Sequence, residues 1–207
     1  GTGVGAGIFV NGHLYRGSEY TAGEIGYLYV PGTEETPLAL RRQGPLESVI
    51  GSKGIEQFWA KLNRSGQNSK KSSQNQRLEA IEIFDLAERG DKQARIVLQQ
   101  TARILADAIT NVCVILNSSL VVLGGRLGTH PALFEATRRI LERNEFSRPQ
   151  LAVSSLGREA QLFGALWLAL NVADARILPV ASDARATHVA PYHSSLALPV
   201  LGLLPPD

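Results

Sequence analysis

The sequence has 207 residues, of which 44% are hydrophobic, and a formal net charge of +2. This length allows a real core but leaves room for only one domain or two small ones. The charge is too even for a nucleic-acid-binding surface, so we expect any DNA contact to lie outside this chain. No apolar run approaches the roughly 20 residues of a membrane-spanning helix, and we expect no membrane partner.

Cysteine usage limits the class further. The single cysteine, Cys113, lies in an apolar helical pattern, which excludes a disulfide framework and a multi-cysteine metal site. A cytoplasmic compartment fits this composition, and the start of the chain has no signal-peptide pattern. The sequence opens directly on a glycine-rich turn and contains no methionine, so we interpret it as a fragment.

The first elements are strands. Residues 4–10 alternate small and apolar side chains, and Asn11-Gly12 is a strong hairpin signal before a return strand that begins at His13. We predict a third strand within TAGEIGYLYV. A surface loop is predicted for PGTEETPLALRRQGPLE, residues 31–47, because its prolines and glycines interrupt regular structure.

Helices are predicted for the middle of the chain. Residues 52–62 and 78–88 have helical periodicity, while residues 64–77 are so polar that we expect a mobile insertion. Asp91 is positioned to cap the next helix. That helix has apolar side chains at intervals of three and four from residue 94 to residue 116, which predicts one face packed on a sheet.

The second half alternates strands and helices. Residues 120–123 form a short apolar run, typical of a parallel strand covered on both faces. A helix beginning near Pro131, a strand at residues 151–156 and a helix at residues 159–171 follow. This order predicts an α/β sheet with crossover helices.

Two glycine-rich segments could carry chemistry. In GTGVGAG, residues 1–7, the lack of side chains would let backbone amides form a nest for a phosphate. A tight turn with small residues for packing is an equal alternative. Gly124-Gly125 follows a buried strand, where open α/β sheets bind ligands, although a plain strand-to-loop turn explains it equally well.

Together these segments resemble the carboxy-terminal portion of the ROK family, whose name joins repressors, open reading frames and sugar kinases. GTGVGAGIFVNGHLYRG and TAGEIGYLYV are similar to the family's phosphate turn and sugar-contact segment, and NSSLVVLGGRLG to its adenosine-contact segment. The resemblance implies an α/β, RNase H-like fold of the actin-like ATPase and sugar kinase type. Residues 1–171 would be the larger lobe, with a β-hairpin start, and residues 172–207 an atypical tail.

The resemblance also implies a sugar site. Glu24 in AGEIG and Glu47 in GPLES would accept hydrogen bonds from sugar hydroxyls, because each ionised carboxylate offers two acceptor oxygens. A solvated loop acid is the alternative for both. Tyr27 would either keep a hydroxyl donor at this site or fill space, and we favour packing.

Nucleotide contacts follow from the same resemblance. If they are retained, phosphate and adenosine would be bound by Gly1, Thr2, Gly3, Gly124 and Gly125. ATP and Mg²⁺ are expected only if the protein is a kinase. We assign no catalytic residue, because the family's catalytic aspartate precedes the segment where this chain begins.

The family's zinc site is not expected here. Its histidine and three cysteines are replaced by Tyr27, Leu38, Leu40 and Pro45. None of these is a zinc ligand, so the chain should bind no metal at this place. We interpret His188 and His193 as incidental surface residues. His13 and His130 are expected in turns, without acidic or cysteine partners.

Three functions remain open. We prefer the sugar-sensing effector domain of a ROK-type transcriptional regulator, a repressor that binds a sugar without turnover and contacts DNA through a segment upstream of residue 1. The first alternative is a fragment of an ATP-dependent, glucokinase-like sugar kinase. The second is a degenerate dimerisation module without a ligand. The expected partners are a small-molecule sugar and a second copy in a homodimer.

Overall fold

The computed structural model describes residues 3–31, 33, 43–65, 78–146 and 148–177. The chain divides into two compact units, residues 1–153 and residues 154–207. The first unit contains β1 (Ile8–Val10), β2 (His13–Tyr15), the 3-10 helix η1 (Ile25–Tyr27), α1 (Pro45–Ile50), α2 (Ser52–Ser65), α3 (Ala80–Glu88), α4 (Lys92–Leu116), β3 (Leu120–Leu123), α5 (Gly125–Gly128), α6 (Pro131–Leu141) and β4 (Gln150–Val153). The second contains η3 (Gly157–Glu159) and α7 (Ala160–Ile177).

The strands of the described residues form two separate pairs. β1 and β2 pair antiparallel, and Asn11 and Gly12 between them have φ angles of 52° and 79°, as a two-residue turn of the primed type requires. β3 and β4 pair parallel. The predicted hairpin and parallel pair are confirmed, but Val122 in β3 is 45% exposed, so the described residues do not cover β3 on both faces.

The third strand predicted within residues 21–30 is wrong. This segment forms η1 instead, and residues 28–30 are irregular. The amides of Ile25, Tyr27 and Leu28 donate to carbonyls only two or three residues earlier in the chain. These local bonds use the donors that a strand would offer to a neighbouring strand.

The predicted loop at residues 31–47 is also wrong at its end, where Pro45 begins α1. Proline suits the first helical position, because the amide it lacks would have no partner within the helix. Leu46 follows with a fully buried side chain, 0% exposed, and so holds the start of α1 against the core. The rest of the loop, residues 34–42, lies outside the described residues.

Two further boundaries differ from the prediction. α2 extends to Ser65, so the first two residues of the expected insertion at 64–77 are helical, and residues 66–77 lie outside the described residues. α7 extends to Ile177, so the expected tail begins as helix, and residues 178–207 lie outside them as well. None of the helices in the described ranges is both long and apolar enough to cross a membrane.

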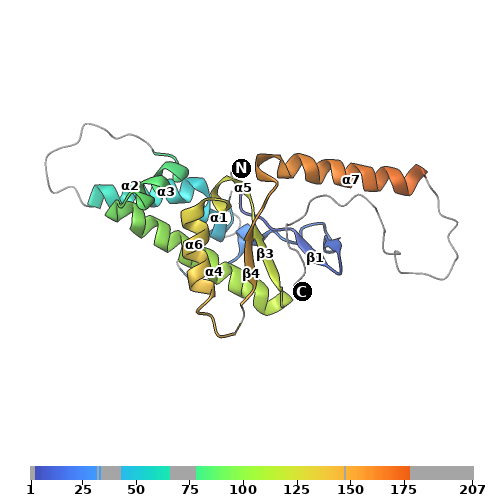
Figure 1. Ribbon diagram of the computed structural model, residues 1–207, viewed down its shortest axis with the longest axis horizontal. Helices are drawn as coiled ribbons and strands as arrows, with labels where there is room; N and C mark the ends of the chain where they lie inside the picture. The colour runs from blue at the N-terminus through green and yellow to red at the C-terminus, as the bar shows by residue number, and fades with distance from the viewer. Residues whose placement is uncertain (1–2, 32, 34–42, 66–77, 147, 178–207) are drawn as a thin grey trace, which may run out of the picture. The chain divides into compact units, whose positions relative to one another are not determined.

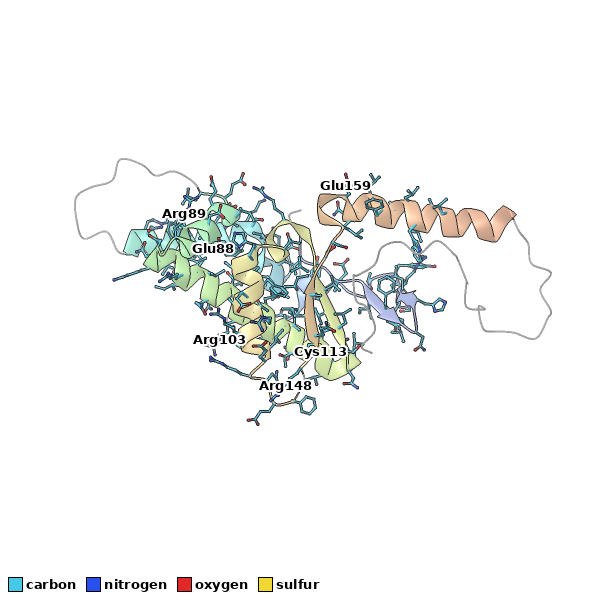
Figure 2. All side chains as sticks on the ribbon, viewed as in Figure 1. Glu88, Arg89, Arg103, Cys113, Arg148 and Glu159 are labelled. Atoms are coloured by element: carbon cyan, nitrogen blue, oxygen red, sulfur yellow. The ribbon has the colours of Figure 1, made fainter. Side chains whose placement is uncertain are left out.

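The predicted long helix α4 is the centre of the first unit, with α2, α3 and α6 packed against it (Figure 1). Its apolar stripe reaches all three clusters of buried side chains. Towards its carboxyl end Cys113 is buried in a cluster with Leu123 of β3, against which Leu151 of β4 also packs (Figure 2). The predicted place of Cys113 in an apolar helical face is therefore confirmed.

Asp91 caps α4 as predicted, because its Oδ1 accepts the Ala94 amide at 2.8 Å. We expect Asp91→Ala to lower the free energy of unfolding of the intact protein by about 1 kcal/mol, since the helix loses one satisfied amide. Asp91→Asn, which keeps a capping oxygen, should lose much less. Urea unfolding of both variants measures this, and equal losses would contradict the capping role.

Glu135 on α6 provides a pH-dependent prediction. Hydrogen bonds from Arg138 and Arg139, at 2.8 and 2.9 Å, lower the pKa of Glu135 from 4.5 to about 2. Because the folded pKa lies below the unfolded one, the stability from these pairs is present above about pH 4.5 and is lost as the pH falls towards 2.

Glu135→Gln should therefore be slightly less stable than the wild type at pH 7 and equally stable near pH 2. Urea unfolding at both pH values measures this difference. The effect is small because the pairs are exposed. Glu145→Gln serves as the control, since no ion pair of Glu145 is found among the described residues. A Glu135 carboxyl that titrates near 4.5 in NMR would contradict the prediction.

Candidate functional site

Three segments far apart in the sequence meet beside α4 and form the candidate site: residues 3–7, 23–27 and 44–47. The first is the glycine-rich turn, the second contains η1, and the third begins α1. The Ala6 amide donates to the Gly23 carbonyl at 2.8 Å, which joins the first two segments. The predicted phosphate turn and sugar segment are therefore in direct contact.

Glycine allows these backbones to touch. A β-carbon on Gly23, whose φ is 94°, would overlap the Ala6 carbonyl, and one on Gly44 would overlap the Gly26 carbonyl. A β-carbon on Gly26 would lie 2.6 Å from the Val4 carbonyl oxygen. Each contact is closer than any side chain permits, so these glycines have a packing role.

Glu47 links the third segment to the turn. It is the third residue of α1, where a carboxylate is favoured by the helix dipole, and its Oε2 accepts the Val4 amide at 3.1 Å. The side chain is half-buried. Glu47 is therefore not a freely solvated loop acid, and its contact with a sugar stays a prediction.

Glu24 and Tyr27 lie at the two ends of η1, in the second of the three segments. Glu24 is exposed at the start of η1, and its carboxylate makes no capping hydrogen bond. Tyr27 is 51% exposed with respect to the described residues, and its role in packing or binding stays a prediction. Both side chains are accessible to a ligand.

The residues predicted to contact a nucleotide lie in two separate segments of the structure. Gly1 and Thr2 lie outside the described residues, and Gly3 is exposed beside Glu47. Gly124 and Gly125 lie at the end of β3, where Gly125 has a φ of 73° and begins α5. Within the described ranges the Gly125 carbonyl bonds only inside its own turn, to Thr129, and not to the glycine-rich turn.

A further cluster was missed by the sequence analysis. His130 is 7% exposed, and its Nε2 lies 3.3 Å from Asp85 Oδ1, so the expectation of no acidic partner is wrong. With Glu88, these residues place three possible ligand atoms within 4.8 Å of one another. The signal in the sequence was a histidine directly before Pro131, a typical helix start.

The His130 geometry favours a helix cap over a metal site. Its Nδ1 accepts the Ala132 amide at 3.2 Å at the start of α6. A neutral ring that accepts at Nδ1 carries its proton on Nε2, and donates it to Asp85. No lone pair then faces the two carboxylates, so we assign no metal to this cluster.

A surface hollow of about 720 Å³ lies between α3, α4 and α6, on other elements than the three segments. Arg95, Arg139 and Arg143 line it, but Glu88 and Glu135 do so too. The charges largely offset one another, and Arg139 is already paired with Glu135 at 2.9 Å. We therefore place the candidate site at the glycine-rich turn.

Comparison with known proteins identifies a family for the chain. The family model described as "ROK family" matches residues 1–172. An N-acetyl-D-glucosamine kinase of Shigella sonnei is 32% identical, over 64% of this chain and 43% of the kinase. A glucokinase of Halalkalibacterium halodurans is 31% identical, over 81% of this chain and 53% of the enzyme. The chain thus spans about half the length of these relatives.

Solved structures agree on the fold. A ROK hexokinase from Thermus thermophilus has a TM-score of 0.62 and 29% identity, covering 84% of this chain and 56% of the hexokinase. A ROK family glucokinase from Streptomyces griseus, in complex with glucose and AMPPNP, has a TM-score of 0.68 and 20% identity, covering 81% and 57%. A ROK family transcriptional regulator has a TM-score of 0.56 and 24% identity, covering 73% and 39%. At these identities the last two show the fold alone, and the predicted α/β, actin-like fold is confirmed.

Gly26→Ala tests the packing of the three segments. The added methyl group would press on the Val4 carbonyl and on Glu47, and we expect a loss of about 1–3 kcal/mol in the free energy of unfolding of the intact protein. Gly164→Ala in α7 is the control, because nothing lies within 4 Å of the added carbon. It should be neutral or stabilising, since alanine favours a helix. Urea unfolding measures the free energy of unfolding of both variants. If Gly26→Ala has the same value as the wild type, the close contact is refuted.

Proposed function

We propose, from the premise that this chain belongs to the ROK family, that it is the sugar-binding larger lobe of an ATP-dependent sugar kinase. Residues 1–171 would form this lobe and act together with a second lobe. The observation that carries the proposal is the Glu47 carboxylate, bonded to the glycine-rich turn beside the accessible Glu24. The two curated relatives reported above, both over 30% identical, are named as sugar kinases, which favours this function over the regulator.

The chemistry of the site suits a polyol. Glu24 has a carboxylate without a capping bond, and Glu47 has one oxygen, Oε1, besides the one that holds Val4. Carboxylate oxygens accept charge-assisted hydrogen bonds from hydroxyl groups, each contributing about 1.5–3 kcal/mol. The names of the relatives point to a hexose or an N-acetylated amino sugar as the ligand class.

The residues present also fit a nucleotide phosphate. Gly5 and Gly7 are exposed, and their amides donate to no acceptor in the described part of the chain. Small residues and free amides form the kind of surface that approaches a phosphate closely. ATP with Mg²⁺ would supply the phosphoryl group, and these residues would hold and orient it. The base that deprotonates the sugar is proposed to come from the second lobe.

One observation keeps the regulator as a second candidate. At two positions of the family's zinc pattern the chain has Tyr27, which is exposed, and Pro45, which is buried in the first turn of α1. Neither is a zinc ligand. A regulator needs recognition without turnover, so it tolerates such changes more readily than a kinase. A homodimer, a cytoplasmic location and DNA contact through an upstream segment stay predictions.

Thermal unfolding of the intact protein with aldohexoses, amino sugars and ATP tests the proposal. A ligand at a hundredfold excess over its Kd should add about 2.7 kcal/mol to stability. We expect stabilisation by a sugar and by ATP, and formation of a sugar phosphate when both are present. Stabilisation by sugar without ATP binding or turnover would support the regulator. No stabilisation by any ligand would favour the degenerate dimerisation module without a ligand.

Glu24→Gln provides the residue-level test. Loss of the charge should weaken sugar binding roughly ten- to hundredfold, because a charge-assisted hydrogen bond becomes a neutral one. Glu145→Gln, an exposed acid beyond α6, should bind sugar like the wild type. Equal affinities of both variants, measured by calorimetry, would remove Glu24 from the site.

A further inference from the structure

Glu47 occupies a slot that two glycines leave open. A β-carbon on Gly3 would lie 3.3 Å from its Oε2, and one on Gly26 would lie 3.4 Å from the same atom. The first distance is tighter than most β-carbon contacts and the second is an ordinary van der Waals contact, so a side chain at Gly3 would press on the carboxylate and one at Gly26 would touch it. Glycine at these two positions therefore accommodates a protein carboxylate as well as a tight turn.

The backbone of Glu47 is firmly held. Its neighbours Pro45, Leu46 and Ile50 are buried, and the last two belong to a cluster that includes Ile104 of α4. α1 also packs against η1. The side chain thus projects from a fixed helix, and its bond to the Val4 amide fixes the turn relative to that helix.

Val4 connects Glu47 to the rest of the glycine-rich turn. Its side chain packs on the cluster around α1 and α4, while its amide points to Glu47. Gly5 and Gly7, whose amides are free in the described part of the chain, follow directly in the turn. The position of the Val4 amide therefore helps to set where these amides lie.

We propose that Glu47 is a positioning residue that couples the two halves of the site: its Oε2 holds the glycine-rich turn through the Val4 amide, while its Oε1 faces the ligand. This rests on the proposed function for the identity of the ligands, but the bond to Val4 does not. Glu24 belongs to the same proposed site but makes no hydrogen bond to the turn among the described residues, so it offers a matched comparison.

The experiment measures amide hydrogen exchange of Val4, and the KM for ATP and for sugar, in the intact protein. Glu47→Ala should speed Val4 exchange about fivefold, the equivalent of one hydrogen bond of about 1 kcal/mol, and should raise the KM for ATP. Glu47→Gln keeps an acceptor oxygen, so it should restore both values while sugar binding stays weakened. Glu24→Ala should raise the KM for sugar only.

The measurements distinguish the bond that holds the turn from the coupling of the turn to ligand binding. Exchange of the buried Ala102 amide in α4 reports global opening, so a rise at Val4 alone reports the local bond. Unchanged Val4 exchange in Glu47→Ala, no rescue by Glu47→Gln, or an equal effect of Glu24→Ala on Val4 would overturn the inference. A protein that binds neither sugar nor ATP refutes the proposed function and the ligand coupling, while Val4 exchange still decides whether Glu47 positions the turn.

Discussion

The burial of α4 is the constraint on which the rest of the first unit depends. This helix of 25 residues supplies side chains to all three buried clusters, and no other element in the described part of the chain does so. One cluster joins it to α2, α3 and α6, the second to α1, and the third to the β3–β4 pair. A helix with apolar residues over such a wide arc is stable in water only when neighbours cover it. The candidate site is built on one of those neighbours, α1.

Around α1 the site is organised by backbone contacts rather than by large side chains. Glycine at 23, 26 and 44 lets three segments approach one another more closely than a β-carbon permits. The carboxylate of Glu47 then enters the remaining space and accepts the Val4 amide. In the proposed site this one acidic side chain would both hold the turn and contact the ligand. α1, a helix of six residues, is anchored by Leu46 and Ile50 in the cluster that includes Ile104 of α4.

Membership of the ROK family accounts for the fold of the chain. The chain spans about half the length of its curated relatives, and the family model matches residues 1–172. A sugar site that lies between two lobes needs residues from both, because orientation of the reacting groups supplies much of the rate of phosphoryl transfer. The proposed contacts of the described residues would serve binding and positioning, which a kinase and a regulator both need.

The sequence by itself determined the regular elements and the family. The period of apolar residues in α4, the Asn11-Gly12 turn and the Asp91 cap are local signals, because they depend on residues only a few positions apart. η1 replaced a strand through hydrogen bonds to carbonyls only two or three residues earlier. Tertiary structure decided the rest. α1 began inside an expected loop with Leu46 buried against Ile104 of α4, and His130 lies against Asp85, so both depend on partners far along the chain. The bond between Glu47 and Val4 joins residues 43 positions apart, so only the folded chain could reveal it.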